Sequence, residues 1–211
     1  MILHGYWRSS AAYRVRIGLH LKRPAFDEVG HNLLKAEQRD PAYVAKVPQG
    51  LVPALESDGR VLAQSLAILE WLDETVPEPP LLPASADDRA VVRAMALAVA
   101  ADIHPVNNLR IVNALRARFG ADDAAVVAWM QHWMAEGFAA LETMVGDHGG
   151  AFAFGDTVGL ADILLVPQWY NAERYRLDTA PYPRLATVVA RARALPAFAA
   201  AAPENHPDAT R

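Results

Sequence analysis

A proline-rich stretch, Pro-Glu-Pro-Pro-Leu-Leu-Pro at residues 77–83, divides the chain into two regions with different periodicities. Before it, strand and helix patterns alternate, and after it every periodic segment is helical. Proline interrupts both kinds of element, so this stretch is expected to be a linker. We predict an α/β domain over residues 1–78, a linker over 79–86 and an all-helical domain over 87–211.

The first region is predicted to follow the order βαβ, helix, ββα. Strands are expected at 2–7, 25–29, 51–57 and 60–63, and helices at about 9–22, 40–47 and 65–75. Asp58-Gly59 between the last two strands is a strong hairpin signal. The helix at 9–22 is expected to be amphipathic, with its basic side chains away from the apolar face.

The second region is predicted to contain only helices, at about 87–119, 122–145, 159–175 and 183–193. Pro105 is expected to kink or split the first of them, because proline cannot donate the backbone hydrogen bond of a helix interior.

Composition excludes several classes of function. The 211 residues carry a net charge of −4, whereas nucleic-acid binders normally have a basic excess. There is no cysteine, so any thiol chemistry must use a sulfur supplied by a cofactor. No segment has the 18 or so apolar residues of a membrane span, and no signal peptide is recognised, so a cytoplasmic protein is expected. The seven histidines lack metal-ligand spacing, and no metal site is predicted.

Two adjacent serines, Ser9 and Ser10, stand where the first helix is expected to begin. Serine before an apolar periodic run is commonly an N-cap. The same end of a helix has unpaired N–H groups and partial positive charge, which favour an anion such as a phosphate or a thiolate. The serines by themselves are compatible with a cap alone or with a cap that also binds an anion.

Two further signals lie in the first region. A cis bond at Val52-Pro53 would leave the Val52 N–H and C=O free to pair with a peptide-like ligand, and an ordinary turn is the alternative. Gln64 and Ser65 open the third helix, where Ser65 is expected to be the N-cap and the helix start could bind a carboxylate.

Polar side chains interrupt the apolar helix pattern between Asp102 and Arg110. His104 and Asn108 are four residues apart and are expected to share one helix face. A histidine here could be an ordinary surface or core residue, but several polar groups beside Pro105 indicate a cleft.

The combination of these segments resembles the zeta class of glutathione transferases, whose members are maleylacetoacetate isomerases, and the related bacterial maleylpyruvate isomerases. Residues 9–19, Ser-Ser-Ala-Ala-Tyr-Arg-Val-Arg-Ile-Gly-Leu, resemble the class signature Ser-Ser-Cys-x-x-Arg-Val-Arg-Ile-Ala-Leu. Residues 52–55 and 64–70 resemble the glutathione-binding half of the family, and 102–110 is most similar to the maleylpyruvate enzymes. The resemblance covers nearly the whole chain. It implies a thioredoxin-like N-terminal domain, an all-α C-terminal domain, a homodimer and glutathione as cofactor.

The resemblance also implies roles for individual residues. The sulfur of glutathione would face the two serines and the backbone N–H of Ala11. The rest of the tripeptide would be held by residues from both regions, namely Gln38, Val52, Pro53, Gln64, Ser65, Asp102, His104 and Asn108. Asp102 and His104 would contact glutathione at least partly across the dimer interface. A dianionic substrate would be bound by Arg8, Arg110 and Arg174, with Arg176 competing for the last role.

The implied activity is cis-trans isomerisation of a maleyl keto acid in aromatic compound catabolism, including tyrosine degradation, by reversible addition of the glutathione thiolate to the double bond. A general transferase that conjugates electrophiles and a non-catalytic glutathione-binding module are the alternatives. Two positions depart from the family pattern. Ala11 stands where the signature has Cys, and Gly159 stands where Ser or Thr usually caps a helix together with Asp162. Because glycine is an acceptable N-cap, that helix is still expected to form.

Overall fold

The computed structural model of the protein describes residues 1–209. Two compact units are present. The first contains Met1–Leu81 together with the chain from Ala194 onward, and the second contains Leu82–Arg193. Within the described residues, no helix combines the length and the apolar character needed to cross a membrane.

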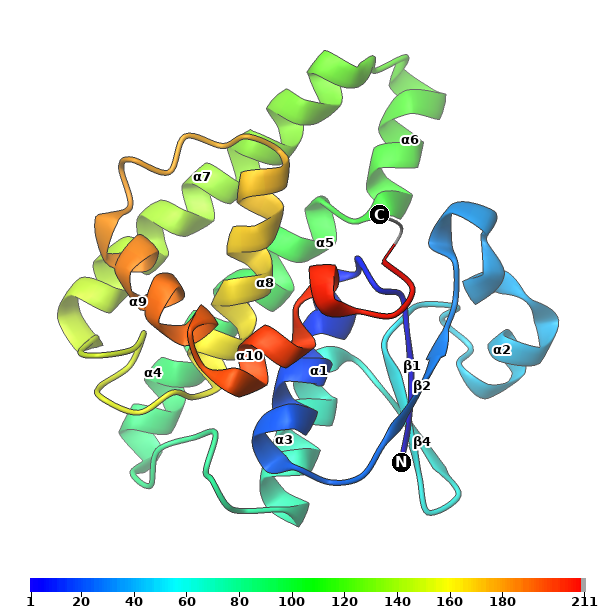
Figure 1. Ribbon diagram of the computed structural model, residues 1–211. Helices are drawn as coiled ribbons and strands as arrows, with labels where there is room; N and C mark the ends of the chain where they lie inside the picture. The colour runs from blue at the N-terminus through cyan, green and yellow to red at the C-terminus, as the bar shows by residue number, and fades with distance from the viewer. Residues whose placement is uncertain (210–211) are drawn as a thin grey trace. The chain divides into compact units, whose positions relative to one another are not determined.

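The first unit is built on a four-stranded mixed sheet of order β2-β1-β3-β4 (Figure 1). Strand β1 pairs in parallel with β2, and β3 pairs antiparallel with both β1 and β4. The crossover between the parallel strands is helix α1, as such a connection requires. The strands are β1 (Ile2–Gly5), β2 (Asp27–Gly30), β3 (Ala54–Ser57) and β4 (Arg60–Ala63).

The hairpin between β3 and β4 is confirmed. Asp58 and Gly59 both have positive φ, 48° and 75°, as a two-residue hairpin turn of the primed type requires. Strands are shorter than expected at β1 and β3, because the loops that follow β1 and precede β3 leave the ladder.

The two faces of the sheet are covered by different helices, since successive strand side chains point to opposite sides. Leu3 and Leu55 pack in one buried cluster with side chains of α1 (Ser10–Lys22) and α3 (Ser65–Thr75). Ala54, the neighbour of Leu55, instead packs with Tyr43 and Val47 at α2 (Pro41–Lys46). Figure 1 shows α1 and α3 together on one side of the sheet and α2 on the other. Two short 3-10 helices, η1 (Leu33–Lys35) and η2 (Glu37–Arg39), lead into α2.

Helix α1 is not amphipathic, so that prediction was wrong. Its three basic side chains inside the helix, Arg14, Arg16 and Lys22, are all buried. The reason is that α1 packs against α3 on one side and, on another, against α10 (Pro196–Ala201), for which no helix was expected. A helix covered on several sides has no solvent face on which to place its charges.

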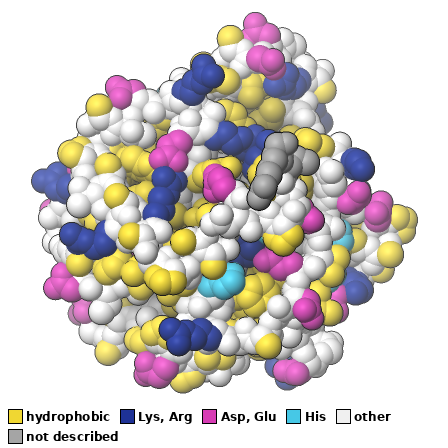
Figure 2. All heavy atoms as spheres, viewed as in Figure 1, with side chains coloured by type: hydrophobic (Ala, Val, Ile, Leu, Met, Phe, Trp, Pro, Cys, Tyr) yellow, Lys and Arg dark blue, Asp and Glu magenta, His cyan; other side chains and the backbone are white. Residues whose placement is uncertain are grey.

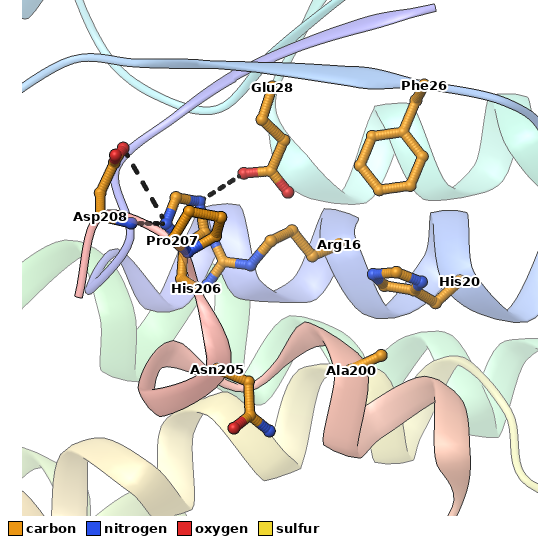
Figure 3. A pocket seen from close by; sticks show the side chains of 9 residues that line it. All are labelled: Arg16, His20, Phe26, Glu28, Ala200, Asn205, His206, Pro207 and Asp208. Atoms are coloured by element: carbon orange, nitrogen blue, oxygen red, sulfur yellow. Dashed lines mark hydrogen bonds and ion pairs between the residues drawn. The ribbon is translucent and has the colours of Figure 1, made fainter.

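Helix α10 and the residues after it return to the first unit. The buried Arg16 donates from Nε to the carbonyl of Ala201 at 3.0 Å. After the 3-10 helix η4 (Pro203–Asn205), the Nε2 of His206 lies 2.7 Å from Oε2 of Glu28 on β2. Arg16, Glu28 and His206 are among the residues that line a cavity of about 300 Å³ (Figure 3). Asp208 lies close over Gly30, where a Cβ would be 2.7 Å from its Oδ2, so a larger residue at position 30 would displace the Asp208 side chain.

The named elements of the second unit are all helices. Its core contains Phe138, whose ring stacks on Trp169 at 5.5 Å and meets Tyr182 edge-on at 5.6 Å. The prediction that Pro105 would split the first helix is confirmed, since a π-helix, a single helical turn and a break replace one continuous helix. The elements are α4 (Ala86–Leu97), the π-helix η3 (Ala98–Ile103), α5 (His104–Val106), α6 (Leu109–Phe119), α7 (Asp123–His148), α8 (Leu160–Arg174) and α9 (Pro183–Arg193).

Helix α8 forms with Gly159 at its N-cap, as expected. The carboxylate of Asp162 makes the other half of the capping box: Oδ2 accepts the N–H of Gly159 at 3.0 Å, and Oδ1 accepts the N–H of Ala153 at 2.9 Å. Asp162 is only 1% exposed, and this burial raises its pKa to about 6 although both backbone bonds favour the charged form.

This raised pKa makes a pH-dependent contribution to stability. The group favours the folded state below its ordinary pKa of 3.8 and loses that contribution as the pH rises through about 6. Asp162→Asn removes the titration. We therefore expect the stability of wild type relative to this variant to fall by on the order of 2 kcal/mol between about pH 4 and pH 7.5. Urea unfolding of both proteins at the two pH values measures this, and a difference independent of pH would contradict it.

Candidate functional site

Sheet topology brings four of the implied glutathione-binding segments to one end of the sheet. Strand β1 ends at Gly5 beside the point where β2 ends, because the two strands are parallel. Strand β3 begins there and β4 ends there, because β3 is antiparallel to both. The loops that leave or enter the sheet at this end carry the serine pair, Gln38, Val52 and Gln64.

The serine pair lies at the N-terminus of α1. Ser9 is the N-cap, with extended φ and ψ of −71° and 118°, and its Oγ accepts the N–H of Ala12 at 3.2 Å. This confirms the cap. Since Oγ acts as the acceptor in that bond, the hydroxyl hydrogen can still be donated to an anion. Ser10 and Ala11 are the next two residues and are buried. The helix start therefore combines a capping hydroxyl with the unpaired donors of a first turn.

The loop before the serines is held by a buried cation. Arg16 Nη2 donates to the carbonyl of Trp7 at 2.9 Å, and the N–H of Ser9 donates to the carbonyl of Tyr6 at 2.9 Å. Burial lowers the pKa of Arg16, and the charge of Glu28 opposes that shift. The guanidinium carbon of Arg8 lies 5.2 Å from the centre of the Trp7 ring, so Arg8 sits beside the serine pair in this fixed loop.

The Val52–Pro53 peptide bond is cis, as the sequence allowed. Among the backbone hydrogen bonds of residues 1–209, none uses the N–H or C=O of Val52. The Val52 side chain packs against the cluster of Tyr43, Val47 and Ala54. A half-buried residue with a free backbone at the end of a sheet can pair with an extended peptide-like ligand.

Ser65 is not the N-cap of α3, which corrects the prediction. Gln64 occupies that position with φ of 70° and ψ of 116°, and its side chain makes no capping bond. The Ser65 hydroxyl instead accepts a hydrogen bond from Nη1 of Arg14 at 3.3 Å. Arg14 is 1% exposed, and burial lowers its pKa to about 9. Its Nε and Nη2 have no partner among the described residues.

The start of α3 therefore has a second feature that favours a carboxylate, in addition to the helix N-terminus that the sequence indicated. A buried guanidinium with unused donors lies beside the N–H groups of the first helical turn, and both favour negative charge. Strained backbone such as that of Gln64 is concentrated at ligand-binding positions.

Gln38, in η2 after β2, lies against the turn at Gly50 that leads toward β3. Gly50 has φ of 56°, and a Cβ there would be 3.0 Å from the carbonyl oxygen of Gln38. Next to it, Gln49 Oε1 accepts a hydrogen bond from Nε2 of Gln64 at 2.9 Å. The side-chain Oε1 of Gln38 is buried without a partner in the described part of the chain. Gln49, which no sequence motif identifies, thus binds Gln64 through its side chain, and its carbonyl oxygen accepts a hydrogen bond from Nη1 of Arg39, the neighbour of Gln38, at 3.1 Å.

The segment 102–110 belongs to the second unit, and one expectation about it was wrong. His104 and Asn108 do not share a helix face, because α5 ends at Val106 and Asn108 is the extended N-cap of α6. Its Oδ1 accepts the N–H of Arg110 at 3.1 Å. Asp102 is exposed in the π-helix, a type of element that is frequent at functional sites. Arg110 is exposed in the first turn of α6.

Arg174 and Arg176 lie at the C-terminal end of α8. Both are exposed, and the guanidinium carbon of Arg174 is 5.1 Å from the Tyr175 ring centre. Arg176 has φ of 54°, a left-handed conformation that non-glycine residues seldom adopt. Gln131 of α7 fixes this turn by donating from Nε2 to the carbonyls of Tyr175 and Arg176 at 2.9 and 3.1 Å. No sequence motif identifies Gln131 as the residue that holds the turn.

The described surface carries charges of both signs and has no grouped metal ligands. In Figure 2, acidic and basic side chains are interspersed over the visible face of the molecule. Within residues 1–209, no group of three or more His, Cys, Asp or Glu side chains is placed to hold a metal ion.

Comparison with known proteins identifies the family. Residues 3–80 match the model of the glutathione S-transferase N-terminal domain. A probable maleylacetoacetate isomerase from Vibrio cholerae is 48% identical, with 99% of this chain and 98% of that protein covered. The chain therefore belongs to the glutathione S-transferase family.

Two solved structures show to which class within this family the chain is similar. A holo structure of a maleylpyruvate isomerase, described as a bacterial zeta-class glutathione transferase, is 46% identical with a TM-score of 0.98 over the whole of both chains. A maleylacetoacetate isomerase from Methylobacterium extorquens AM1, solved with malonate and glutathione bound, is 38% identical with a TM-score of 0.96, again over the whole of both chains. The similarity is thus to the zeta class and to its isomerases.

Proposed function

We propose that the protein is a glutathione-dependent cis-trans isomerase that converts maleylacetoacetate or maleylpyruvate to the fumaryl isomer. The observation that carries this proposal is the N-terminus of α1, where Ser9, Ser10 and first-turn N–H groups form a site for a thiolate in a chain that has no cysteine. Full-length similarity to isomerases of both acids supports the same reaction.

Three groups at the end of the sheet fit the parts of glutathione. The α3 start, with buried Arg14 beside Ser65 and Gln64, fits the γ-glutamyl carboxylate. The free backbone of Val52 fits the cysteinyl backbone. Gln38 is assigned to the glycyl carboxylate. The further contacts assigned by the family resemblance are Asp102, His104 and Asn108.

Bound glutathione supplies the thiolate nucleophile that the isomerisation needs. The residues of this chain hold that charge: the Ser9 and Ser10 hydroxyls and the Ala11 N–H are donors at the positive end of α1, and such donors lower the pKa of a thiol. Because hydroxyl and amide donors perform this task, alanine in place of the signature cysteine at position 11 is compatible with activity.

Arg8, Arg110 and Arg174 are proposed to bind the two carboxylates of the substrate and to stabilise the negative charge that develops on its keto group. Guanidinium groups suit this role because they stay charged and bind carboxylates through two parallel hydrogen bonds. Arg176 is the alternative to Arg174. Its backbone is held in a strained turn by Gln131, whereas Arg174 lies over the Tyr175 ring.

The stoichiometry of glutathione distinguishes an isomerase from a general transferase. Each of the two maleyl keto acids is incubated with the enzyme, with and without glutathione. The amount of fumaryl isomer formed and the amount of free glutathione remaining are then measured. We expect fumaryl product only with glutathione present, and no net loss of glutathione. Consumption of one glutathione per product would support the conjugating transferase. Glutathione binding without turnover of either acid would support a non-catalytic binding module.

We also propose a cytoplasmic homodimer, on the basis of the family resemblance. Several apolar side chains of the second unit are exposed in the single chain, including Phe119 at 78% and Leu97 at 43%, which is consistent with a partner surface. Light scattering after size-exclusion chromatography tests the oligomeric state, and a monomer of 23.0 kDa at micromolar concentration would contradict the homodimer.

A further inference from the structure

The backbone of Val52 is supported from outside the sheet by one side chain of α2. Tyr43 is the only buried residue of that helix and is 4% exposed. Its hydroxyl donates to the carbonyl of Leu51 at 2.7 Å, and its ring belongs to the cluster against which the Val52 side chain packs. Tyr43 therefore holds the residue before Val52 by a hydrogen bond and Val52 itself by packing.

The hydroxyl of Tyr43 is suited to be a permanent donor. Burial raises the pKa of Tyr43 to about 12, so the phenol stays protonated over any working pH range. The 2.7 Å distance from the Tyr43 hydroxyl to its carbonyl acceptor is typical of a well-formed O–H···O hydrogen bond.

The ring of Tyr43 is itself fixed by two histidines. His31, which directly follows β2, lies with its ring centre 4.2 Å from that of Tyr43. Nδ1 of His4 on β1 is 2.9 Å from Nε2 of His31, and Nε2 of His4 is 2.7 Å from Oε1 of Glu56 on β3. The phenol ring is thereby linked to side chains of β1 and β3 through the residue that follows β2.

We propose that Tyr43 is a positioning residue for glutathione: it sets the backbone of Leu51 and Val52 in the geometry that pairs with the tripeptide. The proposal rests on the role given to Val52 in the proposed function. Tyr43 does not touch the reacting atoms, so its loss weakens glutathione binding and leaves the chemical step intact.

Tyr43→Phe keeps the ring and removes only the hydroxyl. We expect KM and Kd for glutathione to rise about two- to tenfold, the effect of losing one neutral hydrogen bond, with kcat at saturating glutathione within twofold of wild type. His31→Gln is a second variant, which removes the ring that contacts Tyr43 but keeps a hydrogen-bonding side chain; a smaller rise in the same direction is expected.

The chain offers a matched control in Tyr182. This tyrosine is also buried, at 7% exposed, and its hydroxyl also donates to a backbone carbonyl, that of Ala135 at 3.1 Å, but within the second unit. Tyr182→Phe should cost comparable stability and leave KM for glutathione unchanged. If Tyr43→Phe and Tyr182→Phe give the same KM, or if Tyr43→Phe lowers kcat with KM unchanged, the positioning role is wrong.

Calorimetric titration of the wild-type protein with glutathione separates this inference from the proposed function. Absence of glutathione binding by the wild type would overturn the assignment of Val52 and the proposed function with it. Normal binding by the wild type together with an unchanged Kd in Tyr43→Phe would overturn the role of Tyr43 alone.

Discussion

Arg110→Ala is expected to lower kcat/KM for the maleyl keto acid about 100- to 1000-fold. Removing one preorganised donor to a developing oxyanion costs about 100- to 1000-fold in rate. The main-chain position of Arg110 is fixed by Asn108, which caps α6 and accepts its N–H at 3.1 Å. KM for glutathione should change little, because Arg110 is assigned to the substrate. Steady-state kinetics with each substrate varied in turn measures both effects.

The same helix supplies a control for this experiment. Arg118 is an exposed arginine near the end of α6, and Arg118→Ala changes the net charge by the same amount. It should retain kcat/KM within about twofold, because an isolated exposed charge contributes little. Wild-type-like turnover in Arg110→Ala would remove this residue from the mechanism. Arg174→Ala and Arg176→Ala, assayed in parallel, decide which of the two binds substrate: the one that does should show a loss comparable to Arg110→Ala.

Asp73→Ala is expected to destabilise the protein by about 3–5 kcal/mol, because it leaves a buried cation without its counter-ion. The Lys22 side chain is 0% exposed, and its Nζ is 2.7 Å from Oδ1 of Asp73. The carbonyls of Val76 and Pro77, at 2.7 and 3.3 Å, accept its other hydrogens. Asp73 Oδ1 also accepts the N–H of Leu81 at 2.7 Å, so the substitution leaves two donors unsatisfied. Chemical denaturation at pH 7 measures the loss.

An exposed ion pair gives the comparison. Arg116 and Asp123 are 2.7 Å apart, with the Asp123 side chain 87% exposed. Breaking this pair in Asp123→Ala should cost less than about 1 kcal/mol, since solvent screens the charges. If Asp73→Ala were no more destabilising than Asp123→Ala, Lys22 would have to be stabilised by the two carbonyls alone.

Much of the local structure could be predicted from the sequence. The helices at 65–75 and 183–193 have the expected bounds, the Asp58-Gly59 hairpin forms, and Ser9 caps α1. Each of these features depends on residues that are near neighbours along the chain. Capping, turn geometry and hydrophobic periodicity are all local, so the sequence carries them directly.

The environment of the charged residues of α1 could not be predicted in the same way. Arg14 reaches Ser65, 51 residues away, and Arg16 reaches Ala201, 185 residues away. A basic residue in a helix pattern is normally assigned to solvent, because burial of a charge is costly unless partners are supplied. Those partners come from α3 and α10, and the sequence pattern of α1 contains no trace of them.

Two site residues changed role for the same reason. Ser65 was expected to be the cap, but the left-handed backbone of Gln64 takes that position and the serine accepts from Arg14. Asn108 was expected to share a helix face with His104, but the chain leaves the helix after Val106 and Asn108 caps the next one. The sequence predicted a break near Pro105, but periodicity within the segment did not show that the helix would stop at Val106, before Asn108.

The sequence by itself determined the order of the strands and main helices over residues 1–75, the Asp58-Gly59 hairpin and the serine pair at a helix start, because these depend on backbone preferences of adjacent residues. Only the tertiary structure decided that the two arginines and the lysine of α1 are buried. The same holds for the hydrogen bond from Arg14 to Ser65 at the start of α3 and for the bond from Tyr43 to the carbonyl of Leu51, next to Val52. These are contacts between segments brought together by sheet pairing and helix packing, and their free energies depend on burial that no single segment specifies.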